Sequence, residues 1–283
     1  MSRKIVSTSF GKFWIATQDQ VIGPKLVETG MWEPYETALL THLLRPDDLF
    51  IDVGANLGWH TVVAGQQVAP NGHVISIEPD PENFSLLTDN IELHKLASHI
   101  STHNIALSDQ AGQVNMEHAP DNLGDHRVRY TQPIPEEDHF QEHTRKLSSV
   151  ESNTLDRLVE ALGESGRGKV RLIKMDTQGS EERILTGGQK TFAKTDYLLC
   201  EFWPYALTRA GGSAEGFLEA VRKFFPQVQV MGGFAVGLER LKTSITQPAD
   251  LAPIAQEMEG GAFLDLLLAR EGLPLPSFPD ITM

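Results

Sequence analysis

Two acidic residues, each at the end of an apolar segment, are the first candidates for chemistry in this sequence. Asp52 ends the segment LFID, and Glu78 ends the segment HVISIE. Glu78 lies 20 positions beyond Gly58 (78 − 58 = 20), the offset at which a nucleoside-binding fold places an acid on ribose hydroxyls. A carboxylate suits a vicinal diol because each of its oxygens can accept one O–H group. The alternative is that both acids are solvent-exposed turn residues.

The turn that follows Asp52 reads G-x-N-x-G, with Gly54, Asn56 and Gly58 at alternate positions. Glycine accepts positive φ, so the chain can turn sharply from a strand into a helix whose first N–H groups are unpaired. A dinucleotide fingerprint would instead read G-x-G-x-x-G and would approach a pyrophosphate. A carboxylate at Asp52 would repel a pyrophosphate, but it suits a ligand that carries an amino group and a sulfonium. The turn therefore favours S-adenosylmethionine over NAD as the cofactor.

Strands that alternate with helices must position these acids. Apolar segments typical of strands are followed by segments with apolar residues at helical spacing, which is the pattern of parallel βαβ units. The expected strands are 49–53, 73–79, 100–107, 170–176 and 196–203, with a closing antiparallel pair of 227–233 and 234–241. The expected helices are 57–69, 81–96, 154–162, 180–194 with a Gly-Gly break, and 214–225. Ligands of open parallel sheets bind outside the carboxyl ends of the strands.

The chain is expected to have one core domain and two extensions. Residues 1–45 are expected to form a strand and a helix packed on the core, and residues 46–245 the cofactor-binding domain. A polar, histidine-rich insertion at about 110–149 is expected to hold a hairpin and a loop. A loop of this length in a compact domain is usually a lid or a binding loop, or is disordered. Residues 246–283 are expected to be a C-terminal extension.

Composition narrows the class of protein. The 283 residues are 40% hydrophobic and carry a formal net charge of −14, so a basic surface for nucleic acid is not expected. The single cysteine, Cys200, excludes an intramolecular disulfide and a cysteine-rich zinc site, and no metal ligands are assigned. Neither a signal peptide nor an apolar run long enough to span a membrane is recognised. The expected location is cytoplasmic.

Six motifs run in a fixed order over about residues 30–205: GMWEPYETALL, LFIDVGANLGWHT, VISIEPDPENFSLLTDNIEL, NTLDRLV, RLIKMDTQGSEERILTGG and CEFWP. As an ordered set they resemble the FkbM family of S-adenosylmethionine-dependent methyltransferases. The resemblance implies a class I methyltransferase fold, an α/β Rossmann-like fold with helices on both faces of a seven-stranded, mostly parallel sheet. The implied strand order is 3-2-1-4-5-7-6, with strand 7 antiparallel.

The resemblance also implies an activity and cofactor contacts. The implied reaction is methyl transfer from S-adenosylmethionine, typically to a hydroxyl of a sugar, polyketide or other small molecule. Carried over by position, it places 52–58 at the methionine part of the cofactor and Glu78 on the ribose. The segment at the end of the third strand would approach the adenine, with the candidate residues Asn104, Ala106 and Ser108.

A second strand-end acid, Asp176, supplies a candidate for the proton transfer. Lys174 and Asp176 are two positions apart on one expected strand, so their side chains point to the same side. In the implied sheet this strand lies beside 49–53, which would bring Asp176 close to Gly54. A hydroxyl acceptor benefits from a base, and Asp176 is the first candidate, followed by Glu201 and Lys174. Alternatively, Asp176 caps the next helix or contacts the cofactor.

Other functions remain open at this stage. A nicotinamide-dependent oxidoreductase is disfavoured by the G-x-N-x-G turn, and a non-catalytic nucleoside-binding or interaction protein could keep the same fold. For His60 both packing and catalysis remain open. The expected partner is a small-molecule hydroxyl acceptor, with no nucleic acid and no membrane span, and the sequence does not indicate an oligomeric state.

Overall fold

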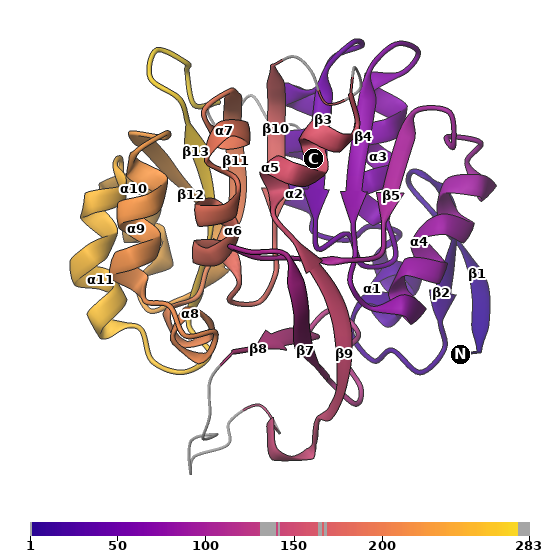
Figure 1. The fold of residues 1–283 in the computed structure, drawn as a ribbon, viewed down its shortest axis with the longest axis horizontal. Coiled ribbons are helices and arrows are strands. Elements are labelled where there is room, and N and C mark those ends of the chain that lie inside the picture. Colours follow the sequence, from indigo (N-terminus) through magenta and orange to yellow (C-terminus); the bar gives the residue numbers. More distant parts are fainter. Residues whose placement is uncertain (1, 131–139, 141, 164–165, 167–168, 277–283) are drawn as a thin grey trace.

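A computed structural model describes the chain except for residues 1, 131–139, 141, 164–165, 167–168 and 277–283. A seven-stranded sheet forms the centre of the molecule, and a smaller sheet projects below it (Figure 1). The strands of the central sheet are β3 (Leu49–Val53), β4 (His73–Ile77), β5 (Ile100–His103), β10 (Val170–Met175), β11 (Thr195–Phe202), β12 (Gln227–Phe234) and β13 (Phe263–Ala269).

The central sheet is mainly parallel, which confirms the α/β class. Its order is β12-β13-β11-β10-β3-β4-β5, and β13 runs antiparallel to both of its neighbours. When these seven strands are numbered along the chain from β3 and the sheet is read from β5, the order is 3-2-1-4-5-7-6. The two halves of the sheet meet where β3 lies between β10 and β4, and this is where the chain reverses direction across the sheet.

The expected pairing of 227–233 with 234–241 is wrong. The left-handed Gly237, with φ of 72°, starts a helix instead, α10 (Leu238–Ser244). The antiparallel partner of β12 is β13, whose sequence FLDLLLA lies within residues 246–283. A strand buried on both faces reads as a continuous apolar run without alternation, so β13 lacked the period-two signal of a hairpin strand. The C-terminal segment thus supplies a strand of the central sheet.

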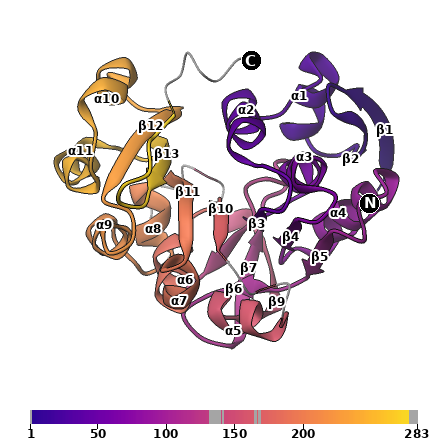
Figure 2. The same ribbon diagram turned by 90° about the horizontal axis from the view of Figure 1, so that it is seen from above.

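Helices cover both faces of the central sheet (Figure 2). Neighbouring side chains of β3 enter different cores, Phe50 on one face and Ile51 on the other, because successive residues of a strand point to opposite faces. The Phe50 face packs against α1 (Ile22–Thr29), α2 (Pro34–Leu43), α3 (Trp59–Val68) and α4 (Pro81–Leu93). The Ile51 face packs against α5 (Leu155–Ala161), α6 (Glu181–Gly187), α7 (Gln189–Phe192), α8 (Pro204–Arg209), α9 (Ala214–Arg222), α10 and α11 (Leu251–Glu257).

The expected helix 180–194 is divided at its Gly-Gly pair into α6 and α7. A Cβ on Gly187 would lie 2.2 Å from the carbonyl oxygen of Ser108, so the close approach of another segment requires glycine here. In the described part of the chain, no helix has the length and apolarity needed to cross a bilayer.

The N-terminal segment packs on the core with two strands and two helices, where one strand and one helix were expected. It forms a hairpin of β1 (Arg3–Thr8) and β2 (Gly11–Ala16), which precedes α1 and α2. The backbone of Trp14 in β2 exchanges hydrogen bonds of 2.6 and 3.0 Å with the side chain of Asn90 in α4. This bidentate contact fixes the hairpin on the helical layer.

The insertion is larger than the expected hairpin and loop. It contributes to a second sheet in the order β6-β9-β7-β8, and the expected third strand 100–107 divides between the two sheets as β5 and β6. The remaining elements are β6 (Ala106–Leu107), β7 (Gly112–His118), β8 (Arg127–Arg129), β9 (Lys146–Asn153) and the short 3₁₀ helices η1 (Glu142–Thr144) and η2 (Pro248–Asp250). Part of the expected loop, 131–139, lies outside the described residues.

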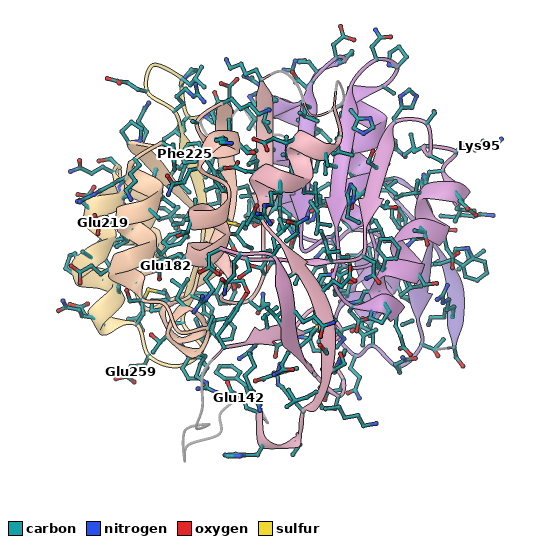
Figure 3. The ribbon with its side chains drawn as sticks, viewed as in Figure 1. Lys95, Glu142, Glu182, Glu219, Phe225 and Glu259 are labelled. Carbon is teal, nitrogen blue, oxygen red and sulfur yellow. The ribbon has the colours of Figure 1, made fainter. Side chains whose placement is uncertain are left out.

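A buried carboxylate, Glu142, ties the insertion to α8 (Figure 3). Its oxygens accept hydrogen bonds from Arg127 at 3.3 Å, from the Tyr205 hydroxyl at 2.9 Å and from Arg209 at 2.9 Å. Arg127 is itself buried. A buried ion pair costs desolvation, but removal of one partner leaves an uncompensated charge, which costs more.

We expect Glu142→Ala to lower the free energy of unfolding by about 1.5–3 kcal/mol, because Arg127 and Arg209 lose the charge that they share while Arg127 keeps Asp125 as a partner. The matched control is Glu219→Ala on the exposed side of α9, which should change it by at most about 0.5 kcal/mol. Denaturant titration of both variants measures the difference. Similar losses in the two variants would show that Glu142 does not hold the insertion in place.

Candidate active site

A cavity of about 760 Å³ opens at the carboxyl ends of the central strands, where α/β sheets bind ligands. Its walls come from the segment before α2, the turns after β3, β4 and β10, the insertion and the β12–β13 region. Of the residues expected at the site, those that line the cavity are Gly54, Asn56, Glu78, Ala106, Lys174, Asp176 and Glu201. Those not among its lining residues are Asp52, Gly58, Asn104 and Ser108.

Gly54 forms the floor of the cavity at the crossing of two chain segments. Its φ is 79°, and a Cβ there would lie 2.0 Å from the carbonyl oxygen of Asp176. The amide of Asp176 donates to the carbonyl of Val53 at 3.1 Å. The expectation that Asp176 ends beside Gly54 is confirmed, and no residue with a side chain could replace this glycine without moving one of the strands.

Asp52 points away from the cavity and into the layer of α3. It is fully buried, and its Oδ2 accepts a 2.6 Å hydrogen bond from the Thr61 hydroxyl. Its Oδ1 has no hydrogen-bond partner. Burial raises the pKa of Asp52, and the nearby charge of Lys174 lowers it again. In the structure, Asp52 supports the turn from behind, whereas the sequence suggested that it faces the ligand.

Three other expected contacts serve the walls of the cavity. A Cβ on Gly58 would lie 2.7 Å from Leu87 Cδ1, so this glycine allows α3 to pack closely on α4. The Asn104 amide donates to the carbonyls of Glu78 and Pro79 at 2.8 and 3.0 Å, which fixes the loop after β4. Ser108 donates to its neighbour Asp109 at 2.9 Å. None of the three is among the residues that line the cavity.

Glu78 is held by backbone N–H groups at the edge of the cavity. Its Oε2 accepts from the amide of Asn56 and its Oε1 from the amide of Asp80, each at 2.8 Å. Burial raises the pKa of Glu78 to about 8, and these two hydrogen bonds oppose the rise. Each carboxylate oxygen accepts more than one hydrogen bond, so both keep capacity for a ligand diol.

One polar cluster lies at the ends of β10 and β11 and consists of Lys174, Asp176, Gln178 and Glu201. The ammonium of Lys174 lies 3.5 Å from Asp176 Oδ2 and 3.4 Å from the carbonyl oxygen of Gly54. The Gln178 amide donates to Asp176 at 2.7 Å and to Glu201 at 3.3 Å. Burial opposes the charge of Lys174, but the surrounding acids, Asp176 first, raise its pKa. Lys174 is therefore a cation and does not serve as a base.

Several residues of the cavity were not assigned from the sequence, notably Glu33, Glu36 and Asp265. His60 also lines the cavity, 3.6 Å from Glu33. One signal appears only in the backbone: Glu33, Asn56 and Gln178 have φ of 43°, 51° and 57°. Such left-handed conformations are costly for residues with side chains and cluster at functional sites.

Three potential metal ligands, Asp80, His118 and His126, converge beside the cavity. The backbone N–H of Ala119 donates to His126 Nδ1 at 3.1 Å, so the neutral ring carries its proton on Nε2, the nitrogen that faces Asp80. His118 Nδ1 lies 3.1 Å from the same Asp80 oxygen, and its Nε2 lies 2.7 Å from the Ser148 hydroxyl. These roles describe a hydrogen-bond network that joins the insertion to the loop after Glu78, and they leave His126 no free lone pair for an ion.

The buried acids predict how stability depends on pH. Burial raises the pKa of Glu78 to about 8, and burial together with the charge of Asp265 raises that of Glu36 to about 7. An acid whose pKa is raised in the folded state stabilises the fold at pH values below its unfolded pKa of 4.5. This contribution is lost as the pH rises through the pKa of the folded state.

We therefore expect the melting temperature to fall from pH 7 to pH 9. Glu36→Gln removes one of the groups responsible, so its melting temperature should fall less over the same interval. Thermal melts at matched ionic strength measure both slopes. A melting temperature that rises over this range would contradict the raised pKa values.

Comparison with known proteins adds a family to this geometry. The model of the FkbM methyltransferase domain matches residues 52–227. The 2-O-methyltransferase NoeI of Sinorhizobium fredii is 25% identical over 210 residues, which cover 71% of this chain and 80% of NoeI.

Two further relatives match over a smaller part of their length. The hexuronic acid methyltransferase AglP of Haloferax volcanii is 25% identical over 164 residues, 58% of this chain and 59% of AglP. The 31-O-demethyl-FK506 methyltransferase FkbM of Streptomyces tacrolimicus is 28% identical over 169 residues, 51% of this chain and 60% of FkbM. Because the family model covers more than half of the sequence, the chain belongs to the FkbM methyltransferase domain family.

Proposed function

We propose that this chain is an S-adenosylmethionine-dependent O-methyltransferase that acts on a hydroxyl of a sugar, polyketide or other small molecule. The observation that carries the proposal is the meeting of two strand-end acids in one cavity, Glu78 after β4 and Asp176 after β10, on either side of the Gly54 turn. The relatives NoeI, AglP and FkbM are O-methyltransferases or sugar-acid methyltransferases by name, which supports the acceptor class.

The residues of the cavity fit the proposed cofactor. Glu78 would accept the ribose hydroxyls, since both of its oxygens keep acceptor capacity beside their backbone contacts. Apolar side chains of Ile105, Ala106 and Leu107 line the same cavity and would hold the adenine ring. Gly54 and Asn56 would face the methionine part.

When bound, S-adenosylmethionine would supply an electrophilic methyl group, whose transfer forms the new O–C bond, breaks the S–C bond and leaves a neutral thioether. The protein must hold the acceptor oxygen in line and take its proton. We assign the proton to Asp176, which lies beside Gly54. Glu201 is the alternative, because burial raises its pKa and a raised pKa makes a carboxylate a better base. Lys174, as a cation, orients Asp176.

The cofactor assignment is tested by calorimetry with S-adenosylhomocysteine and NAD. We expect the first to bind and NAD to bind weakly or not at all. Glu78→Gln should weaken binding of S-adenosylhomocysteine by about 0.5–1.5 kcal/mol for each ribose hydrogen bond lost, the scale of a hydrogen bond to a group that burial keeps largely uncharged. Glu82→Gln, an exposed change on the next helix, is the matched control. Micromolar NAD binding without any heat from S-adenosylhomocysteine would rule out the proposed function.

Glu78→Ala separates the two roles of this side chain. Its loss leaves the buried amides of Asn56 and Asp80 without their acceptor, which costs about 1–3 kcal/mol for each group. The alanine variant should therefore melt clearly lower than the parent, in thermal melts without ligand.

Asp176→Asn tests the proton transfer. The variant should fold and bind S-adenosylhomocysteine, and single-turnover transfer of a labelled methyl group should slow by roughly 10²–10⁴, the usual effect of a positioned base. Glu201→Gln is the comparison, since the two carboxyls share the Gln178 amide. A full rate in Asp176→Asn together with a slow Glu201→Gln would move the role to Glu201. A loss of affinity in Asp176→Asn would make Asp176 a cofactor ligand.

A further inference from the structure

Acidic side chains crowd the part of the cavity that lies over β10, β11 and β13. The carboxyl groups that line this part are Glu33, Glu36, Asp176, Glu201 and Asp265. In the sheet, β11 is three strands from β4, which carries Glu78 at its end, and three strand spacings amount to about 14 Å. These acids therefore face a different part of the ligand space from the one that Glu78 serves.

Two of these acids lie directly opposite each other on neighbouring strands. Glu201 of β11 is the register partner of Asp265 of β13, and like charges in this position destabilise a sheet. On the other side of β13, Gly232 of β12 faces Asp265, and a Cβ there would come within 3.0 Å of Asp265 Oδ2. The glycine leaves the space that the carboxyl occupies. The strands thus accommodate two acidic side chains that repel each other, where two apolar side chains would not.

The cationic side chains that line the cavity already form ion pairs with other acids. Lys174 pairs with Asp176, Arg127 with Asp125 and Glu142, and Lys242 with Glu239. Among the residues that the structure describes, no cationic side chain lies within ion-pair distance of the three remaining acids, Glu36, Glu201 and Asp265.

The pKa values of the acids in this cluster reflect the shortage of positive charge. Burial, with the charge of Glu33 next, raises the pKa of Asp265 to about 7. Burial also raises the pKa of Glu33 to about 8, against the opposing charge of Lys174. A second, independent observation is His60, which is 4% exposed and whose Nε2 has no hydrogen-bond partner although it lies 3.6 Å from Glu33. The cluster therefore lacks a nearby cation that would keep Glu36 and Asp265 ionised.

We propose that the acceptor carries a protonated amine near the hydroxyl that is methylated, and that Glu36, Glu201 and Asp265 bind its ammonium group; this rests on the proposed methyltransferase function. An ammonium presents three N–H donors and no acceptor, which complements such a cluster. The ring of Trp32 lines the same cavity, and aromatic faces attract cations. Amino sugars and related amino polyols combine these features, whereas a uronic acid would add another carboxylate.

The test uses three probes with one ring shape and different charge: glucosamine, glucose and glucuronate. Each is titrated at constant ionic strength into protein saturated with S-adenosylhomocysteine, and binding is followed by the fluorescence of Trp32 and Trp203, which line the cavity. We expect glucosamine to bind at least tenfold more tightly than glucose, and glucuronate not to bind.

The variants Glu201→Gln and Asp265→Asn should reduce the affinity for glucosamine to that for glucose. Both remove a like-charge repulsion, so neither should melt below the parent, and S-adenosylhomocysteine should still bind. Glu219→Gln on the exposed face of α9 is the control and should leave the preference unchanged.

The two proposals fail in different ways. Absence of S-adenosylhomocysteine binding would count against the methyltransferase function itself. With S-adenosylhomocysteine bound, an affinity for glucose or glucuronate equal to that for glucosamine, or no binding of any of the three sugars, overturns the amine proposal alone. A glucosamine preference that survives in both carboxyl variants also overturns it.

Discussion

The carboxyl edge of the central sheet depends on the contacts of one buried cation, the ammonium group of Lys174. It contacts Asp176 Oδ2 and the carbonyl oxygen of Gly54, and its charge lowers the pKa of Asp52 and of Glu33, which burial would otherwise raise further. Acids from β3, β10 and the start of α2 could not be buried so close together without a cation among them. The tight Gly54–Asp176 crossing and the acid-lined cavity both follow from this arrangement.

Local features of the sequence predicted much of the fold and part of the site. The glycine turn after β3, the strand-end positions of Glu78 and Asp176, and the alternation of strands and helices depend on neighbouring residues, and the structure has them. The direction of Asp52 was not predictable in this way. Its neighbours Ile51 and Val53 face the layer of α5 and α6, so Asp52 faces α3 and Thr61. Position at a strand end does not determine which face a side chain takes.

Long-range pairing accounts for what the sequence did not reveal. The apolar segment of β13 pairs with β11, which ends more than sixty positions earlier in the chain, and no local period marks that partner. The same holds for Glu33, which has a left-handed φ of 43° and interacts electrostatically with Lys174, far along the chain. Because these residues meet only after the sheet has closed, propensity and spacing carry no signal for them.

The residues of the site lie partly inside and partly outside the region that matches the family. The matched region, residues 52–227, contains Glu78, Asp176 and the glycine turn, all of which would serve the cofactor and the methyl transfer. Glu36 precedes it and Asp265 follows it. Residues from both ends of the chain therefore join Glu201 of the matched core on the proposed acceptor side of the cavity. Because Glu36 and Asp265 do not contact Lys174, changes at these two positions would alter the proposed acceptor preference and leave the contacts of Lys174 with Asp176 and Gly54 in place.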